Sequence, residues 1–87
     1  MTFQIIISDE VKKIIRNATK SYQELVTKKL DALADFPHFL DIKKIKGRTN
    51  IFRLRIGDYR AIFEVDYEEK TIYVKAFDTR QRIEKHY

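Results

Sequence analysis

Residues 51–66 read IFRLRIGDYRAIFEVD, and this stretch decides the fold. Apolar and polar residues alternate on both sides of Gly57-Asp58, which is the pattern of two antiparallel strands joined by a two-residue turn. Such a turn fixes the register of the strands, so Arg55 is expected to lie directly opposite Arg60. Because residues two apart share a face of a sheet, the hairpin should have one apolar face and one face rich in arginine.

A third alternating segment, residues 71–78, follows a four-residue turn and extends both faces. The apolar face, expected to pack on helices, comprises Phe52, Leu54, Ile56, Tyr59, Ala61, Phe63, Val65, Ile72, Val74 and Ala76. The opposite face comprises Arg53, Arg55, Arg60, Ile62, Glu64, Tyr73, Lys75 and Phe77. Lys75 is expected to lie diagonal to Arg60, on the neighbouring strand. Like charges opposed across a strand pair are destabilising, so these cations indicate a bound anion such as a phosphate backbone. The alternative is a solvated face whose charge is partly neutralised by Glu64 and the acidic residues of the tail. The aromatic residues of that face could stack on bases.

The N-terminal part predicts one strand and two helices. Residues 3–7 are apolar and β-branched, as in a strand, and Ser8 or Asp9 can cap a helix. Ser21 and Glu24 fit a capping box for a second helix that ends before Pro37. Residues 39–50 are basic and irregular and are read as a loop that could include a short strand at 42–45, and the tail 79–87 is expected to be a helical turn or an ordered coil. The fold class is therefore α+β over one domain, residues 1–87: two helices on one face of a small, mainly antiparallel twisted sheet, in the order β-α-α-β-β-β.

Composition narrows the function classes. The 87 residues carry a formal net charge of +5, and the excess lies in residues 43–87, where twelve Lys and Arg stand against seven Asp and Glu. A basic half favours a polyanionic partner. Without cysteine, disulfides, thiolate catalysis and cysteine zinc sites are excluded, and two histidines are too few for a convincing zinc site. No apolar run approaches the roughly 18 residues of a membrane span, and no basic leader precedes Asp9, so a cytoplasmic protein is expected.

The chemistry that remains is a metal-free, cofactor-free cationic site. Guanidinium groups can stabilise the extra negative charge that develops when the 2′-hydroxyl of RNA attacks its own phosphodiester. A base must take the 2′-proton and an acid must protonate the leaving 5′-oxygen. His86, Tyr87 and Lys75 are the titrating groups at hand, since arginine stays protonated. His38, beside Pro37, is read as an incidental loop residue, and whether His86-Tyr87 is ordered stays open.

Four segments together resemble the RelE branch of the RelE/ParE toxin superfamily: KKIKG at 43–47, FRLRIGDYRAIFEV at 52–65, IYVKAF at 72–77, and Arg80-x-Arg82. The resemblance implies a toxin of a type II toxin–antitoxin system, which enters the ribosomal decoding site and cuts messenger RNA without a metal. The products would be a 2′,3′-cyclic phosphate and a 5′-hydroxyl. It implies catalytic roles for Arg53, Arg55, Arg60, Arg80 and Tyr87. Arg60 would hold the scissile phosphate, Arg80 would stabilise charge or act near the leaving group, and Tyr87 would stack on or orient the substrate.

The chain also departs from this family. The two basic residues of the middle strand are lysines in the best-known relative and arginines here, which leaves the general base open. The spacing from Arg80 to Tyr87 is one residue longer, which keeps Arg82 in consideration. The closing His86-Tyr87 is similar to the end of the YoeB relatives, so His86 is an alternative base or acid.

The residues expected to bind RNA are Lys43, Lys44, Lys46, Arg48, Lys75, Arg82, Tyr73 and Phe77. The partners implied by the resemblance are the ribosome, its message and a RelB-like antitoxin in a heterodimer or heterotetramer. Two alternatives remain: a ParE-like inhibitor of DNA gyrase, and a basic binding module without catalysis.

Overall fold

A computed structural model describes residues 2–36 and 42–86, apart from the side chain of His86. Within these residues the chain forms β1 (Gln4–Ile7), α1 (Asp9–Arg16), α2 (Lys20–Ala32), a 3₁₀ turn η1 (Leu33–Asp35), β2 (Ile42–Lys44), β3 (Ile51–Ile56), β4 (Tyr59–Asp66), β5 (Thr71–Thr79) and α3 (Arg80–His86). The five strands are ordered β1-β5-β4-β3-β2. The β1–β5 pair is parallel and the other pairs are antiparallel. The predicted α+β class, with two helices on a mainly antiparallel sheet, is confirmed. Strand β2 and helix α3 extend the predicted order β-α-α-β-β-β.

Both N-terminal helices begin at side-chain caps. Ser8 Oγ accepts a hydrogen bond from the Val11 N–H at 3.2 Å, as its sequence position predicted. Thr19 Oγ1 accepts one from the Tyr22 N–H at 3.3 Å, so α2 begins at Lys20. The predicted start at a Ser21–Glu24 capping box was therefore wrong, because Thr19 already provides the cap two residues earlier.

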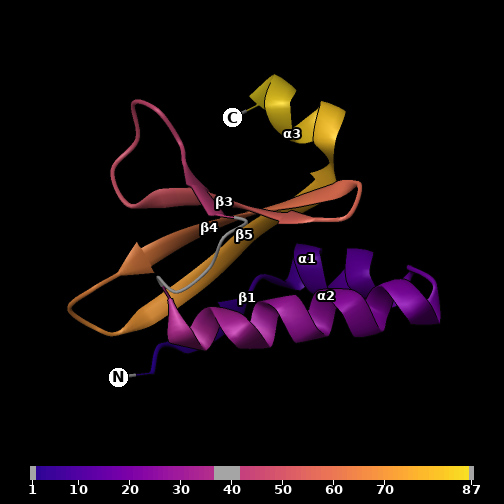
Figure 1. Ribbon diagram of the computed structural model, residues 1–87, viewed down its shortest axis with the longest axis horizontal. Coiled ribbons are helices and arrows are strands. Elements are labelled where there is room, and N and C mark those ends of the chain that lie inside the picture. The colour runs from indigo at the N-terminus through magenta and orange to yellow at the C-terminus, as the bar shows by residue number, and fades with distance from the viewer. Residues whose placement is uncertain (1, 37–41, 87) are drawn as a thin grey trace.

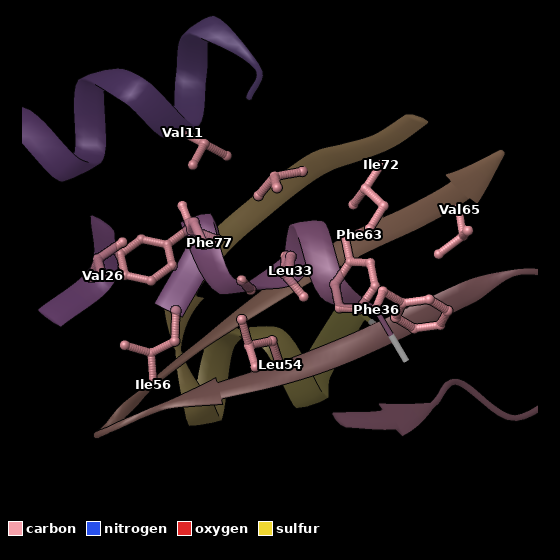
Figure 2. Packing of buried hydrophobic residues seen from close by; sticks show 13 residues of the cluster. Val11, Val26, Leu33, Phe36, Leu54, Ile56, Phe63, Val65, Ile72 and Phe77 are labelled. Carbon is pink, nitrogen blue, oxygen red and sulfur yellow. The ribbon is translucent and has the colours of Figure 1, made fainter. Parts of the chain in front are cut away.

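The helix-facing side of the sheet supplies most of the core. Helices α1 and α2 lie together on this side, which we call the inner face (Figure 1). Its buried strand residues are Leu54, Ile56, Ala61, Phe63, Val65, Ile72 and Val74, and they pack with Val11, Val26, Leu30, Leu33 and Phe36 (Figure 2). Full burial of a side chain of this size contributes about 1.5–3 kcal/mol. The apolar face predicted from the alternation is thus confirmed up to Val74.

Beyond Val74, the side chains of β5 lie on the opposite faces of the sheet from those predicted, because β5 contains a bulge. Ile62 pairs with Ala76 but Phe63 pairs with Val74, so Lys75 is an extra residue in β5. Phe77 consequently lies in the core, 2% exposed, and stacks on Tyr59 at a centroid distance of 4.9 Å. The prediction that Phe77 lies on the outer, RNA-binding face was wrong, and so was the prediction that Ala76 lies on the inner face.

The tail forms helix α3, which lies on the other side of the sheet from α1 and α2 (Figure 1). Ile83 is 3% exposed and packs with Ile45 and Ile62 in a second, smaller cluster. We call this side of the sheet the outer face. Part of it is therefore covered rather than solvated, which residue alternation alone did not predict.

No helix in the described ranges 2–36 and 42–86 is long and apolar enough to cross a membrane.

Candidate functional site

The β3–β4 hairpin brings cations together on the outer face. Arg55 pairs directly with Arg60, as predicted from the two-residue turn. Arg53 lies two residues before Arg55 and so shares its face, and Lys43 of β2 pairs with Arg53. The outward gathering of these side chains, on which the interpretation of the sequence depended, is present in the structure.

Arg60 is the most enclosed of these cations. It lies on the arginine-rich face, as predicted, but its side chain is only 9% exposed. Its Nη1 donates to the carbonyl oxygens of Gly57 at 3.1 Å and Tyr59 at 2.9 Å, so the guanidinium folds back over the turn. The side chain is thus held in one place by the backbone of its own hairpin.

Burial and like charges lower the pKa of Arg60. Burial is the larger cause, followed by the nearby charges of Arg55, Arg53 and Arg80, while Glu84 acts in the opposite direction. Arg80, the first residue of α3, is anchored here because its N–H donates to the Asp58 carbonyl at 3.1 Å. We refer to Arg53, Arg55, Arg60 and Arg80 as the arginine cluster.

Glu84 lies within the arginine cluster, and the sequence did not single it out among the acidic residues of the tail. Its Oε1 is 3.1 Å from Arg80 Nε and 3.9 Å from Arg53 Nη1. An exposed pair of this kind contributes at most about 1 kcal/mol, so its main effect is to offset local positive charge. The i, i+4 spacing of Arg80 and Glu84 was the signal that could have revealed it, had the tail been predicted as a helix.

Lys75 is not beside Arg60. The register places Asp78 opposite Arg60, and Lys75 instead forms an ion pair with Glu64. The prediction that Lys75 lies diagonal to Arg60 was therefore wrong, because the bulge displaces it.

A second basic group surrounds a pocket beside α3. The pocket measures about 590 Å³, and Arg48, Lys75 and Arg82 line it together with Glu10 and Asp78. Arg82 also pairs with Asp78 at 3.7 Å. Arg48 further lines a shallow hollow that includes Lys44 and Lys46. Of the predicted RNA-binding cations, Lys43 thus lies at the hairpin, and the others line this pocket or the adjoining hollow, with Arg48 in both.

Other predicted residues are dispersed. Tyr73 is 36% exposed and pairs with Glu64. Lys44 pairs with Phe52, so its side chain belongs to the opposite face from that of Lys43. Tyr87, His38 and the side chain of His86 lie outside the described residues. Among the described residues, no three His, Cys, Asp or Glu side chains gather as a metal site would require.

Comparison with known proteins identifies the family. Residues 7–84 match the family model described as the ParE toxin of the type II toxin–antitoxin system, parDE. A curated relative from Methanocaldococcus jannaschii, which carries a provisional RelE1 toxin name, is 25% identical over 84 residues, 93% of each chain.

Solved structures show the same fold. The chain matches the archaeal RelE–RelB complex of Pyrococcus horikoshii with a TM-score of 0.81 and 28% identity, covering 94% of this chain and 99% of that one. It matches a free E. coli RelE mutant with a TM-score of 0.77 and 21% identity, covering 97% and 90%, a likeness of fold alone. Since the family model spans most of the sequence, the chain belongs to the ParE toxin family of type II toxin–antitoxin systems, and its relatives place it in the RelE branch of the RelE/ParE superfamily.

Proposed function

We propose that this toxin cleaves messenger RNA on the ribosome and so inhibits translation. The observation that carries the proposal is the arginine cluster, which holds four guanidinium groups at one end of the outer face around a largely buried Arg60. Four cations brought together at a cost in repulsion are better explained by a bound polyanion than by folding.

The proposed chemistry is transfer of the phosphodiester to the neighbouring 2′-oxygen. The 2′-hydroxyl loses its proton and its oxygen bonds to phosphorus, the bond from phosphorus to the 5′-oxygen breaks, and that oxygen gains a proton. Arg60 would bind the phosphate with the three N–H groups on Nε and Nη2, because the two Nη1 hydrogens serve the turn. Arg53, Arg55 and Arg80 would stabilise the negative charge that develops on the non-bridging phosphate oxygens in the transition state.

Proton transfer is proposed for His86 and Tyr87 on the basis of the sequence. Lys75 is a weaker candidate because its ammonium is paired with Glu64, away from the arginine cluster. The remaining basic residues, Lys43, Lys46, Arg48 and Arg82, would bind phosphates on either side of the cut, and Tyr73 would stack on a base. Lys44 is left out because its side chain belongs to the opposite face from that of Lys43.

The proposed protein partner is a RelB-like antitoxin, in a heterodimer or heterotetramer within the cytoplasm. It is supported by the RelE–RelB complexes of Pyrococcus horikoshii and Methanococcus jannaschii, whose toxin chains have this fold. The basic charge of the cluster suits an acidic segment of such a partner.

The proposed function can be tested by adding the purified protein to a translation extract and mapping the ends of the message. Primer extension should show new message ends only when ribosomes occupy the message. The family model is named for parDE, which favours inhibition of DNA gyrase as the second candidate. Intact message together with double-strand DNA breaks would support that candidate, whereas a protein harmless in cells without its antitoxin would indicate a binding module alone.

Glu84→Gln is expected to tighten binding to ribosome-bound message by about twofold to fivefold, because it removes a negative charge that competes with phosphate for the arginine cluster. The gain should shrink as salt is raised. Glu68→Gln, the same change in the β4–β5 turn, is the control. Slower cleavage by Glu84→Gln with unchanged affinity would contradict this role and assign the carboxylate to proton transfer.

A further inference from the structure

The turn at Gly57-Asp58 is held from the inner face by a residue distant in sequence. Tyr22 extends from α2, and its hydroxyl accepts a hydrogen bond from the Asp58 N–H at 2.9 Å. The same hydroxyl donates to the Ile56 carbonyl at 3.4 Å. Tyr22 therefore contacts the backbone on both sides of Gly57.

Gly57 allows this close approach. Its φ is +58°, in the left-handed region that favours glycine. A Cβ at this position would lie 2.5 Å from the Tyr22 hydroxyl oxygen. The hydroxyl thus lies directly against the turn, and the turn has little room to shift towards α2.

The same turn holds the arginine cluster from the outer face. Arg60 donates to the carbonyls of Gly57 and Tyr59, and the Arg80 N–H donates to the Asp58 carbonyl. The backbone of residues 57–59 therefore connects the Tyr22 hydroxyl to the guanidinium of Arg60 and to Arg80, the first residue of α3. A displacement of the turn would move both cations relative to a bound phosphate.

We propose that Tyr22 is a positioning residue for the arginine cluster: its hydroxyl fixes the Gly57-Asp58 turn and, through that turn, the place of Arg60 and the start of α3. This inference rests on the proposed RNA cleavage. The ring of Tyr22 has a separate packing role, since it contacts the Tyr59 ring edge-on at 5.0 Å. Removal of the hydroxyl alone separates the two roles.

The test compares Tyr22→Phe with Tyr67→Phe on ribosome-bound message. Tyr67 lies in the β4–β5 turn, 45% exposed, and is a matched loss of one phenolic hydroxyl. Tyr22→Phe should lower kcat about tenfold and change KM less than twofold, because a small misplacement of catalytic groups slows reaction more than it weakens binding. Tyr67→Phe should change neither. The proposal would be overturned if Tyr22→Phe had the same kcat as Tyr67→Phe. It would also be overturned if Tyr22→Phe raised KM by the same factor as it lowered kcat.

Nuclear magnetic resonance of the free protein gives a second readout that needs no cleavage. Tyr22→Phe should shift the signals of the Asp58 amide and the Arg60 Nε–H, and Tyr67→Phe should leave both in place. If the wild type cleaves no message, the proposed function fails and this readout alone decides the positioning role. An unmoved Arg60 signal overturns that role.

Gly57→Ala perturbs the same contact from the other side. If Tyr22→Phe does not fold, the loss of kcat in Gly57→Ala relative to the wild type is the readout, and an unchanged kcat overturns the proposal. Alone, Gly57→Ala should reduce kcat more than Tyr22→Phe does, because the added Cβ meets the hydroxyl oxygen. In the Tyr22→Phe background part of that loss should be recovered, since the nearest atom is gone. Strictly additive losses in kcat would contradict a direct coupling between Tyr22 and the turn.

Discussion

Arg60→Met is expected to slow cleavage of ribosome-bound message by about 10²–10³-fold, the usual loss when one preorganised group that stabilises transition-state charge is removed. Methionine preserves the length of the side chain but carries no charge and no N–H. The loss should appear in the single-turnover cleavage rate. Arg16→Met, the same change in the last turn of α1, is the control and should cleave normally.

The same variant should remain folded, with a melting temperature equal to or above that of the wild type. The fold lowers the pKa of Arg60, through burial and the neighbouring arginines. The folded state therefore binds this proton less tightly than the unfolded state, so the charge opposes folding. That cost is fully present at neutral pH, begins to fall only as the pH rises through the pKa of the folded state, and is gone above the pKa of the unfolded state. A melting temperature lowered by 10 °C or more, on the order of 2 kcal/mol for a domain of this size, would show that Arg60 is structural instead.

Phe77→Ala is expected to lower the free energy of unfolding by about 3–5 kcal/mol, because it opens a cavity in the core. Phe77 is 2% exposed and stacks on Tyr59. Tyr73→Ala, on the same strand but 36% exposed, should cost less than about 1 kcal/mol. Urea unfolding measures both.

This pair of variants also tests the bulge. If β5 had no extra residue, Phe77 would share the outer face with Tyr73, and the two substitutions would cost similar amounts. Equal losses of stability, or a loss of RNA affinity with Phe77→Ala at unchanged stability, would contradict the observed register.

The hairpin was predictable because its register depends on two adjacent residues. Gly57-Asp58 fixes the pairing of Arg55 with Arg60, and every residue of β3 and β4 then falls on its observed face. The faces of β5 were predictable only as far as Val74. An extra residue such as Lys75 leaves no mark in an alternating pattern, so the reversal at Phe77 required coordinates.

The candidate site was only partly predictable for a related reason. The sequence indicated which arginines share a face, but the burial of Arg60 depends on its folding back onto Gly57 and Tyr59. The approach of Glu84 depends on the docking of α3 through Ile83, a contact between distant segments. The hydroxyl of Tyr22 meets the turn across more than thirty residues, which no local pattern reports.

The proposed role of the RNA's own 2′-hydroxyl is tested most directly with a ribosome-bound message that carries a single 2′-deoxynucleotide on the 5′ side of the cut. The account predicts that the unmodified message is cut there, leaving a 2′,3′-cyclic phosphate and a 5′-hydroxyl, and that the deoxy message stays intact. Cutting of the deoxy message at the same place and rate would contradict it.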